Sequence, residues 1–259
     1  MNDFVAPRTV ADKTDCLFYH VMDIPGVGTV DGRWDLRPTI DEYLGGANVR
    51  RKRVLDVGAA SGYLTFEMER RGAEVVSLDM RDGRDWHLVP FVHPDYDLDH
   101  WRSQFMEWDR RLKNAYWFAH QRIGSAARAF YGDIFSLPDA IGEFDMAMFG
   151  MVLPHIRDPF QALYSVSRRV RDAIIITQQA PRVEEAYAFF MPEAETLSPN
   201  AAWWSMSEAC VAKMLGVVGF AVEDRIRCAH LCRNREGDRQ ADGTEMCTTF
   251  VAKRVRNAA

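Results

Sequence analysis

The fold is constrained most by a strand, a glycine-rich turn, a helix and a second strand that follow one another along the chain. Residues 54–62 read VLDVGAASG, in which apolar positions suit a buried strand while Gly58 and Gly62 release the backbone into a tight turn. The following residues contain neither glycine nor proline as far as Gly72, as is typical of a helix and its terminating glycine. EVVSLDM at 74–80 then predicts a second strand. This βαβ order indicates a parallel sheet of the kind that binds nucleotides.

The rest of the chain continues the alternation. Further strands are expected at residues 127–133, 144–150, 172–178, 221–232 and 246–254, with helices at 158–169 and 205–220. The last two strands are separated by a polar loop and predict an antiparallel hairpin. We therefore predict the α/β fold class, with a seven-stranded, mostly parallel sheet that ends in an antiparallel C-terminal hairpin.

Two regions lie outside this regular pattern. Residues 1–50 are irregular, so we expect an N-terminal cap or lid on an α/β domain formed by residues 51–259. Residues from about 81 to 126 separate the second strand from the third and are rich in aromatic side chains, including Trp86 and Trp117. Long connections inside a compact domain tend to be functional. We expect either a helical layer whose aromatic residues belong to the core or part of a substrate pocket, with Trp86 and Trp117 as substrate-binding candidates.

Charge and composition disfavour a nucleic-acid partner. The chain has 259 residues, 47% hydrophobic composition and a net charge of -5, which allows a full core and gives no attraction to phosphates. Basic clusters at 50–53, 110–113 and 168–171 flank predicted element ends and are interpreted as solvated faces. We therefore expect a small-molecule substrate, and the chain is also compatible with a homodimer.

The sequence gives no sign of a membrane span or of disulfides. No apolar run approaches the roughly 18 to 20 residues that a membrane span needs, and the N-terminus lacks a secretory pattern. The five cysteines are scattered and odd in number, unlike a disulfide framework. We expect a cytoplasmic protein.

The ligand of the glycine turn is indicated by its spacing and by acids. The turn reads GAASG, so it lacks both the G-x-G-x-x-G dinucleotide pattern and the Gly-Lys-Ser/Thr of a P-loop. Asp56 lies in the first strand, Asp79 ends the second, where a carboxylate can accept both ribose hydroxyls, and Asp133 ends the third. Together the three acids favour an adenosine without phosphates.

With these motifs the chain resembles the class I S-adenosylmethionine-dependent methyltransferases over roughly residues 50–254. VLDVGAASG resembles the first motif of that family, SLDM the second and YGDIFSLP the adenine-binding motif, and FDMAMFGMVLPHIRDPFQAL resembles the fourth strand with its loop. The chain departs from the family at Ala60, where glycine is usual. The resemblance implies a Rossmann-like fold and S-adenosylmethionine as cofactor.

The resemblance also implies roles for individual residues. Gly58 and Gly62 would border the methionine portion, Asp79 the ribose, and Asp133 with Ile134 the adenine. Phe149 and Gly150 would lie beneath the sulfonium. The set expected to bind the cofactor from these motifs is Asp56, Gly58, Ala60, Gly62, Asp79, Met80, Asp133, Ile134, Phe149 and Gly150.

The flanking segments 18–38 and 113–138 resemble an uncharacterised bacterial subgroup. That subgroup is similar to the enzymes that modify the wobble uridine of transfer RNA with a carboxymethyl group. The resemblance therefore leaves a transfer-RNA modifier with a carboxylated cofactor as an alternative function. A cofactor-binding scaffold without catalysis is a further alternative.

Two histidines are candidates for a catalytic base. Methyl transfer needs the acceptor held near the methyl group and, for a hydroxyl or ammonium acceptor, the removal of a proton. His155 follows the fourth strand, where it acts as a base or shapes the cofactor pocket. His20, in FYHVMDIP, lies in the expected lid, where a pair with Asp23 would orient it. The alternative for His20 is a structural role.

The remaining candidates are arginines and aromatic residues. Arg33, with Trp34, and Arg37 are expected to grip a carboxylate of the cofactor or substrate, because a guanidinium binds a carboxylate bidentately. The alternative for these arginines is a salt bridge to Asp35 or Asp41. The residues expected to contact the acceptor are Tyr19, Arg37, Trp86, Trp117, Trp203 and Trp204.

The pattern of cysteines and histidine in the C-terminal hairpin disfavours a zinc site. Cys228, His230 and Cys232 alternate on a predicted strand, and Cys247 lies in the partner strand. No close Cys-x-x-Cys pair is present, and alternating cysteines in a strand are more often core. We expect no metal. The sequence thus predicts an S-adenosylmethionine-dependent methyltransferase of a small molecule, with an oxygen acceptor favoured over nitrogen.

Overall fold

A single mixed sheet forms the centre of the molecule. The computed structural model describes residues 4–83, 95–193, 202–233 and 243–256. Within those residues the sheet has nine strands in the order β1-β7-β6-β5-β8-β9-β13-β12-β4. Its parallel strands are β5 (Arg53–Val57), β6 (Glu74–Asp79), β7 (Arg128–Tyr131), β8 (Phe144–Gly150) and β9 (Val170–Gln178). Strands β12 (Phe220–Cys232) and β13 (Gly243–Arg254) form the antiparallel hairpin. The predicted α/β class and C-terminal hairpin are confirmed.

The predicted strand count was two too low because both edge strands come from the N-terminal segment. Strand β1 (Phe4–Val5) pairs with β7, and β4 (Trp34–Asp35) pairs with β12 at the far edge. Each edge strand has only two residues, which is too short to show an alternating pattern. Between them lie a small hairpin, β2 (Met22–Ile24) with β3 (Gly28–Val30), and helix α1 (Ile40–Tyr43) follows β4. The N-terminal segment therefore reaches both edges of the sheet.

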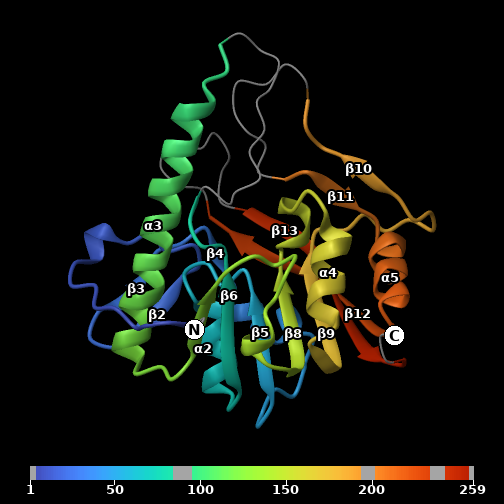
Figure 1. The fold of residues 1–259 in the computed structure, drawn as a ribbon, viewed down its shortest axis with the longest axis horizontal. Helices are drawn as coiled ribbons and strands as arrows, with labels where there is room; N and C mark the ends of the chain where they lie inside the picture. Colours follow the sequence, from blue (N-terminus) through green and yellow to red (C-terminus); the bar gives the residue numbers. More distant parts are fainter. Residues whose placement is uncertain (1–3, 84–94, 194–201, 234–242, 257–259) are drawn as a thin grey trace.

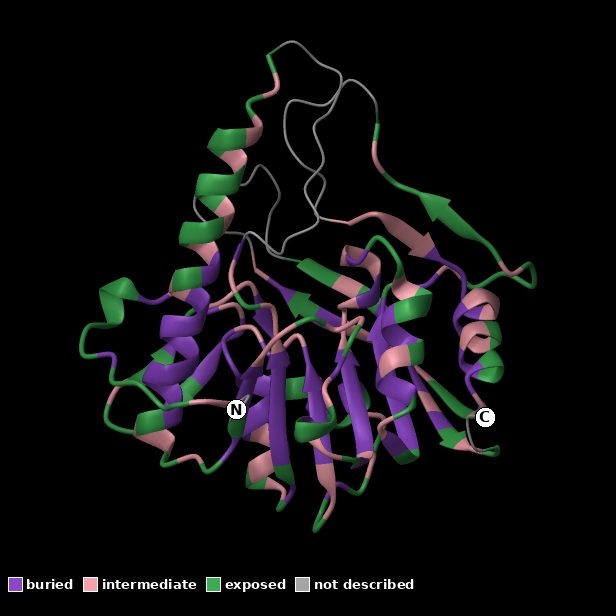
Figure 2. Cartoon of the chain, viewed as in Figure 1, coloured by how far each residue is buried: buried purple, intermediate pink, exposed green. Residues whose placement is uncertain are grey.

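Helices cover both faces of the sheet. Successive residues of a strand point to opposite faces, so each central strand contributes side chains to two cores. Val54 of β5 belongs to the core beneath α2 (Tyr63–Arg70) and α3 (Leu98–Ile123), whereas Leu55 belongs to the core beneath α4 (Pro159–Ser167) and α5 (Glu208–Val217). Figure 2 shows the buried strands enclosed between these layers. The near-continuous apolar strands are explained by burial on both faces.

Helix α3 accounts for most of the described part of the aromatic connection. It begins after Asp97, whose side chain accepts a hydrogen bond from the His100 N–H, and ends at Gly124, whose φ is 70°. Its C-terminal half is buried against the sheet, and its N-terminal half extends beyond the carboxyl ends of the strands (Figures 1 and 2). Trp117 is 1% exposed and lies in the core. The core interpretation therefore holds for Trp117, while Trp86 lies outside the described residues.

None of the helices formed by the described residues has the length and apolar character needed to span a bilayer.

Candidate active site

The turn between β5 and α2 is held in a conformation that needs small residues. Gly58 and Gly62 have φ values of 76° and 89°, in the left-handed region that favours glycine. A side chain at Gly58 would collide with Val152, and one at Gly62 would collide with Phe66 and Tyr116. Ala60, which stands where glycine is usual, also has a positive φ of 49°. The methyl group is therefore tolerated with some backbone strain.

Asp79 lies at the end of β6 and faces the glycine turn. Its Oδ2 accepts a hydrogen bond from the Ala60 N–H at 2.9 Å, and its Oδ1 accepts one from the Met80 N–H at 2.8 Å. Burial raises the pKa of Asp79, while the positive charge of Lys113 and the two backbone hydrogen bonds oppose that rise. Each oxygen keeps a further lone pair for a ligand. A half-buried carboxylate beside a turn of small residues fits the adenosine part of the cofactor.

Asp56 occupies a different place from the one expected. It is fully buried, with its Oδ2 accepting a hydrogen bond from the Thr65 hydroxyl at 2.6 Å. That hydroxyl lies 2.8 Å from Ser77 Oγ, which lies 2.9 Å from the Tyr116 hydroxyl. Burial raises the pKa of Asp56 to about 7. Asp56 therefore joins β5, α2, β6 and α3 beneath the turn and presents no surface to a cofactor.

At the end of β8, the backbone and not a side chain lies near the glycine turn. A side chain at Gly150 would collide with Leu64 and press on the Tyr43 hydroxyl. Phe149 is fully buried in the core on the α4 side, so its side chain cannot contact a sulfonium as expected. The backbone at Gly150 is thus the part of this motif that is placed toward the turn.

The third acidic motif lies next to the second. The Gly132 N–H donates to the Asp79 carbonyl at 2.9 Å, which fixes the loop after β7 beside the end of β6. Asp133 is exposed, and its Oδ1 accepts a hydrogen bond from the Phe135 N–H at 2.8 Å. Ile134 is half-buried. Both residues therefore belong to the loop that is fixed beside the end of β6.

The N-terminal segment lies directly on the glycine turn. The Tyr19 N–H donates to Ser61 Oγ at 3.0 Å, and the Trp34 indole N–H donates to the Tyr19 hydroxyl at 3.3 Å. His20 is 7% exposed, and its ring centroid lies 5.6 Å from that of Tyr63 at the start of α2. Sequence reasoning missed Ser61 and Tyr63, although both lie in or beside the glycine motif.

The environment of His20 keeps its imidazole neutral. Burial lowers the pKa of His20 to about 3, and its Nδ1 has no hydrogen-bond partner among the described residues. The predicted pair with Asp23 is wrong, because the Asp23 carboxylate binds the Thr29 hydroxyl at 2.5 Å and Arg37 at 3.1 Å. His20 therefore offers a neutral ring nitrogen without a carboxylate behind it.

The arginines of the N-terminal segment have structural partners. Arg37 binds Asp35 at 2.8 Å as well as Asp23, so the salt-bridge alternative holds for Arg37 and it is not a free carboxylate clamp. Trp34 is buried at 6% exposure and pairs with Cys232 of β12. Arg33 is half-buried, and its carbonyl accepts a hydrogen bond from the Arg233 N–H at 2.6 Å.

The loop after β8 is fixed by an aromatic hairpin. His155 is half-buried in the 3-10 helix Leu153–His155. The Trp203 N–H donates to the Pro154 carbonyl at 2.7 Å, and the Trp204 indole N–H donates to the Arg157 carbonyl at 3.0 Å. Strands β10 (Ala188–Phe190) and β11 (Trp204–Met206) form this hairpin at the carboxyl side of the sheet (Figure 1).

Phe190 of β10 was missed by sequence reasoning. Its ring lies 5.3 Å from that of Trp204 and 6.1 Å from that of Trp203, and it is 51% exposed. The run of aromatic residues at 187–190 is a signal that could have found it. The hairpin therefore brings three aromatic side chains to the loop that carries His155.

The cysteines form no described metal site. Cys228 lies opposite Cys247 in the hairpin register, and the His230 Nδ1 lies 2.7 Å from the Thr39 hydroxyl. All five cysteines are free thiols. In the part of the chain that the structure describes, no group of His, Cys, Asp and Glu side chains could hold a metal ion.

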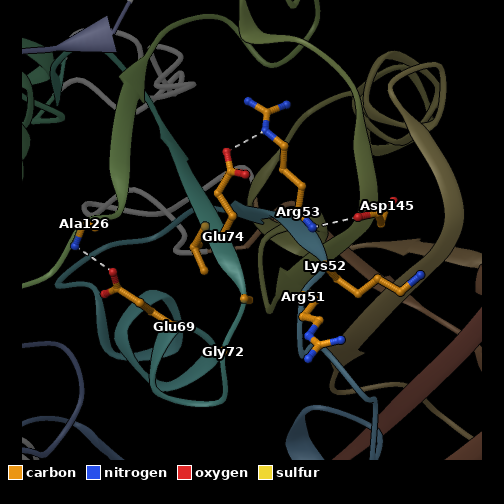
Figure 3. Close-up of a pocket in the computed structure, with 10 residues that line it drawn as sticks. Arg51, Lys52, Arg53, Glu69, Gly72, Glu74, Ala126 and Asp145 are labelled. Carbon is orange, nitrogen blue, oxygen red and sulfur yellow. Dashed lines mark hydrogen bonds and ion pairs between the residues drawn. The ribbon is translucent and has the colours of Figure 1, made fainter.

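A cavity of about 540 Å³ lies at the opposite end of the strands (Figure 3). It is lined at the amino ends of β5 and β6, far from the glycine turn, and two of its charged side chains pair with each other. Arg53 binds Glu74 at 3.0 Å, and Glu69 accepts from the Ala126 N–H at 2.6 Å. Size alone does not make this hollow the site, because the convergent side chains of a nucleotide site are at the other end.

The sequence matches the methyltransferase domain family over residues 34–214. The chain belongs to that family. It is an S-adenosylmethionine-dependent methyltransferase of class I, and the cofactor expected from the motifs is confirmed. No match is found among curated protein sequences. The similarity to enzymes of the transfer-RNA wobble uridine is not confirmed, although one similar structure is a putative RNA methyltransferase from Pyrococcus horikoshii.

Solved structures share the fold at low sequence identity. The N-terminal domain of EvdMO1 with bound SAH has a TM-score of 0.54 at 17% identity and covers 94% of each chain. Magnesium protoporphyrin IX methyltransferase from Synechocystis PCC 6803 with bound SAH has a TM-score of 0.50 at 15% identity, covering 85% of this chain and 81% of that one. The [4+2]-cyclase SpnF has a TM-score of 0.52 at 16% identity, covering 82% and 67%.

Proposed function

We propose that this methyltransferase modifies a small molecule, with oxygen as the first candidate for the acceptor atom and nitrogen as the second. The observation that carries the proposal is His20, whose unpartnered Nδ1 is buried beside the glycine turn. A neutral imidazole can accept the proton that a hydroxyl loses as its oxygen is methylated. His20 is therefore assigned the role of base.

The cofactor is proposed to lie along the carboxyl ends of β5, β6 and β7. When bound, S-adenosylmethionine supplies an electrophilic methyl group on sulfur. The turn from Gly58 to Gly62 and the backbone at Gly150 would lie along its methionine portion, and Asp79 would accept the ribose hydroxyls. Asp133 and Ile134 would border the adenine. The support for this placement is the set of positions where no side chain fits, together with a carboxylate fixed by two backbone amides.

The acceptor is proposed to lie between the N-terminal segment and the aromatic hairpin. Tyr19 and His20 approach from one element, and His155 with Trp203 and Trp204 come from the elements after β8 and β9. Aromatic walls with a few polar atoms are typical of small-molecule sites. The named substrate of the similar magnesium protoporphyrin IX methyltransferase is also a small molecule, which supports this class.

The basic clusters give an RNA acceptor no support. Arg110 is paired with Glu107 at 2.7 Å, and Arg111 donates to the Thr14 and Cys16 carbonyls. Lys113 is buried. The cations of the 110–113 cluster are thus paired or buried, and the net charge of -5 adds no attraction to phosphates.

The test has a binding arm and a transfer arm. Calorimetry with S-adenosylhomocysteine and with NAD should show a saturable site for the first only. Methyl-labelled S-adenosylmethionine, incubated with a metabolite extract, should then label a low-mass product, whose bond to the methyl group is assigned by mass spectrometry. Binding without any labelled product from extract or RNA would instead favour a scaffold, and label found only in transfer RNA would overturn the small-molecule proposal.

A further inference from the structure

Lys113 is a buried cation whose side chain points into the protein. It was grouped by sequence with an exposed basic cluster, yet its side chain is 8% exposed. It projects from the buried half of α3, where its ammonium group donates to Asp109 Oδ2 at 2.7 Å and to the Arg81 carbonyl at 2.9 Å. Burying a lysine is costly unless its donors are satisfied, so this placement needs a reason.

Its contacts connect α3 to the two strand ends that frame the proposed ribose site. Arg81 follows Asp79 by two residues, so the bond to the Arg81 carbonyl fixes the backbone leaving β6. Tyr131 ends β7 and pairs in register with Asp79. The Lys113 Nζ lies 4.7 Å from the centroid of the Tyr131 ring. Lys113 thus lies against both strand ends at the position of Asp79.

Lys113 also acts on Asp79 through its positive charge. Burial raises the pKa of Asp79, and the positive charge of Lys113 is the largest opposing influence. An ionised carboxylate accepts hydrogen bonds from two hydroxyls, whereas a protonated one must use an oxygen as a donor. The affinity for a ribose therefore depends on the ionised form.

We propose that Lys113 is a positioning residue for Asp79: it fixes the backbone after β6 and supplies the positive charge that a ribose-binding carboxylate requires there. This inference rests on the proposed place of Asp79 at the ribose. The ionisable groups around Asp79 come from three elements and the loop after β6. They are Asp56 on β5, Asp109 and Lys113 on α3, Tyr131 on β7 and, beside Asp109, Asp82.

The test measures the affinity for S-adenosylhomocysteine at pH 6, 7 and 8 by calorimetry. In Lys113→Met the loss of affinity between pH 8 and pH 6 should be about tenfold greater than in the wild type, because losing a neighbouring cation raises the pKa of a carboxyl group. Combining it with Asp79→Asn should abolish this additional pH dependence. A pH profile parallel to that of the wild type overturns the proposal.

Asp109→Asn is the matched control, because it removes a negative charge whereas Lys113→Met removes a positive one. It preserves the shape of the side chain and an oxygen acceptor for Lys113, but removes a negative charge close to Asp79. Affinity at pH 6 should stay within about threefold of the wild type or improve, since less negative charge favours the ionised form of Asp79. A tenfold loss in Asp109→Asn would show that any disturbance of this pair weakens binding, and the proposal would fail.

Folding and the proposed function are controlled separately. If melting curves show that Lys113→Met is unfolded, Lys113→Gln, which keeps a donor for the Arg81 carbonyl without the charge, is measured in its place. If Asp79→Ala binds S-adenosylhomocysteine as tightly as the wild type, the proposed ribose site itself is wrong. If Asp79→Ala binds weakly while the Lys113 variants follow the wild-type profile, only this inference fails.

Discussion

The proposed cofactor side of the site is built mainly from residues 53–79, which are continuous in sequence and are joined by the loop after β7 and the end of β8, whereas the proposed acceptor side is assembled from distant segments. On the cofactor side, backbone amides and glycines of neighbouring elements hold Asp79 in place. On the acceptor side, the segment around His20 reaches the turn through Tyr19 and Ser61, while Trp203 holds the loop after β8 from a separate hairpin.

This difference separates two kinds of variant. Changes on the cofactor side should alter the affinity for S-adenosylmethionine, because its ligands there are fixed by local geometry. Changes on the acceptor side should alter turnover or acceptor KM and leave the affinity for the cofactor nearly intact. The following predictions test that separation, beginning with the largest effect.

His20→Ala should have the largest effect on turnover. If His20 removes the acceptor proton, kcat on the identified acceptor should fall by roughly 10² to 10⁴, with the affinity for S-adenosylhomocysteine almost unchanged. His155→Ala should affect both, since its loop is expected to touch cofactor and substrate. Full turnover in His20→Ala would leave the reaction to His155 or to positioning alone.

The pH dependence of turnover is a second test of the role of His20. Because burial lowers the pKa of His20 to about 3, the base should remain unprotonated and kcat should not fall between pH 7 and pH 5 through this group. An apparent pKa near 6.5 that vanishes in His20→Ala would contradict the buried environment.

Asp79→Ala should give the largest effect on cofactor binding. Losing hydrogen bonds to a charged acceptor costs about 1.5 to 3 kcal/mol, or roughly 10- to 150-fold in affinity. Calorimetry with S-adenosylhomocysteine measures it. Asp172→Ala is a matched control, because Asp172 pairs with Lys52 on the surface at the start of β9, and it should bind like the wild type. Equal affinities in all three proteins would remove Asp79 from the site.

Asp56→Asn should change stability with pH. The folded pKa of Asp56, about 7, lies above its ordinary value of 3.8, so the folded state retains a proton that the unfolded state releases between those values. Stability therefore falls as pH rises through this window. At pH 8 the variant should be more stable than the wild type by about 1 to 2 kcal/mol, with a smaller difference at pH 5. Thermal melts showing the opposite order would contradict the buried, proton-retaining carboxyl.

Trp204→Phe should have the smallest effect. It removes the indole donor to the Arg157 carbonyl, worth about 0.5 to 1.5 kcal/mol, and should raise the KM for the acceptor by roughly 2- to 10-fold. The affinity for S-adenosylhomocysteine should not change. If the affinity for the cofactor falls as much as the KM rises, the two sides are not separable at this hairpin.

Sequence reasoning was most accurate where local chemistry determines the structure. The strand expected at 144–150 is β8 with the same bounds, and the glycine turn adopts the positive φ angles that its composition requires. Both follow from patterns within a few residues. The βαβ order then specified the parallel strands, since a crossover helix leaves few alternatives.

The errors concern contacts between distant residues. Asp23 was paired with His20 by proximity in sequence, but Arg37 and Thr29 bind it in the structure. Lys113 was placed on a solvated face because a charged cluster does not reveal which helix face packs inward. Trp117, which was also a candidate for the substrate pocket, lies in the core instead. A single sequence carries little information about such long-range packing.

The paired edges of the sheet have a consequence for biosynthesis. A ribosome releases Phe4–Val5 and Trp34–Asp35 well before β7 and β12, the strands with which β1 and β4 pair. Contacts so distant in sequence form slowly, because loop closure must precede them. The N-terminal segment can therefore be fixed at both edges of the sheet only after β12 has been made, so the β4 edge is completed late.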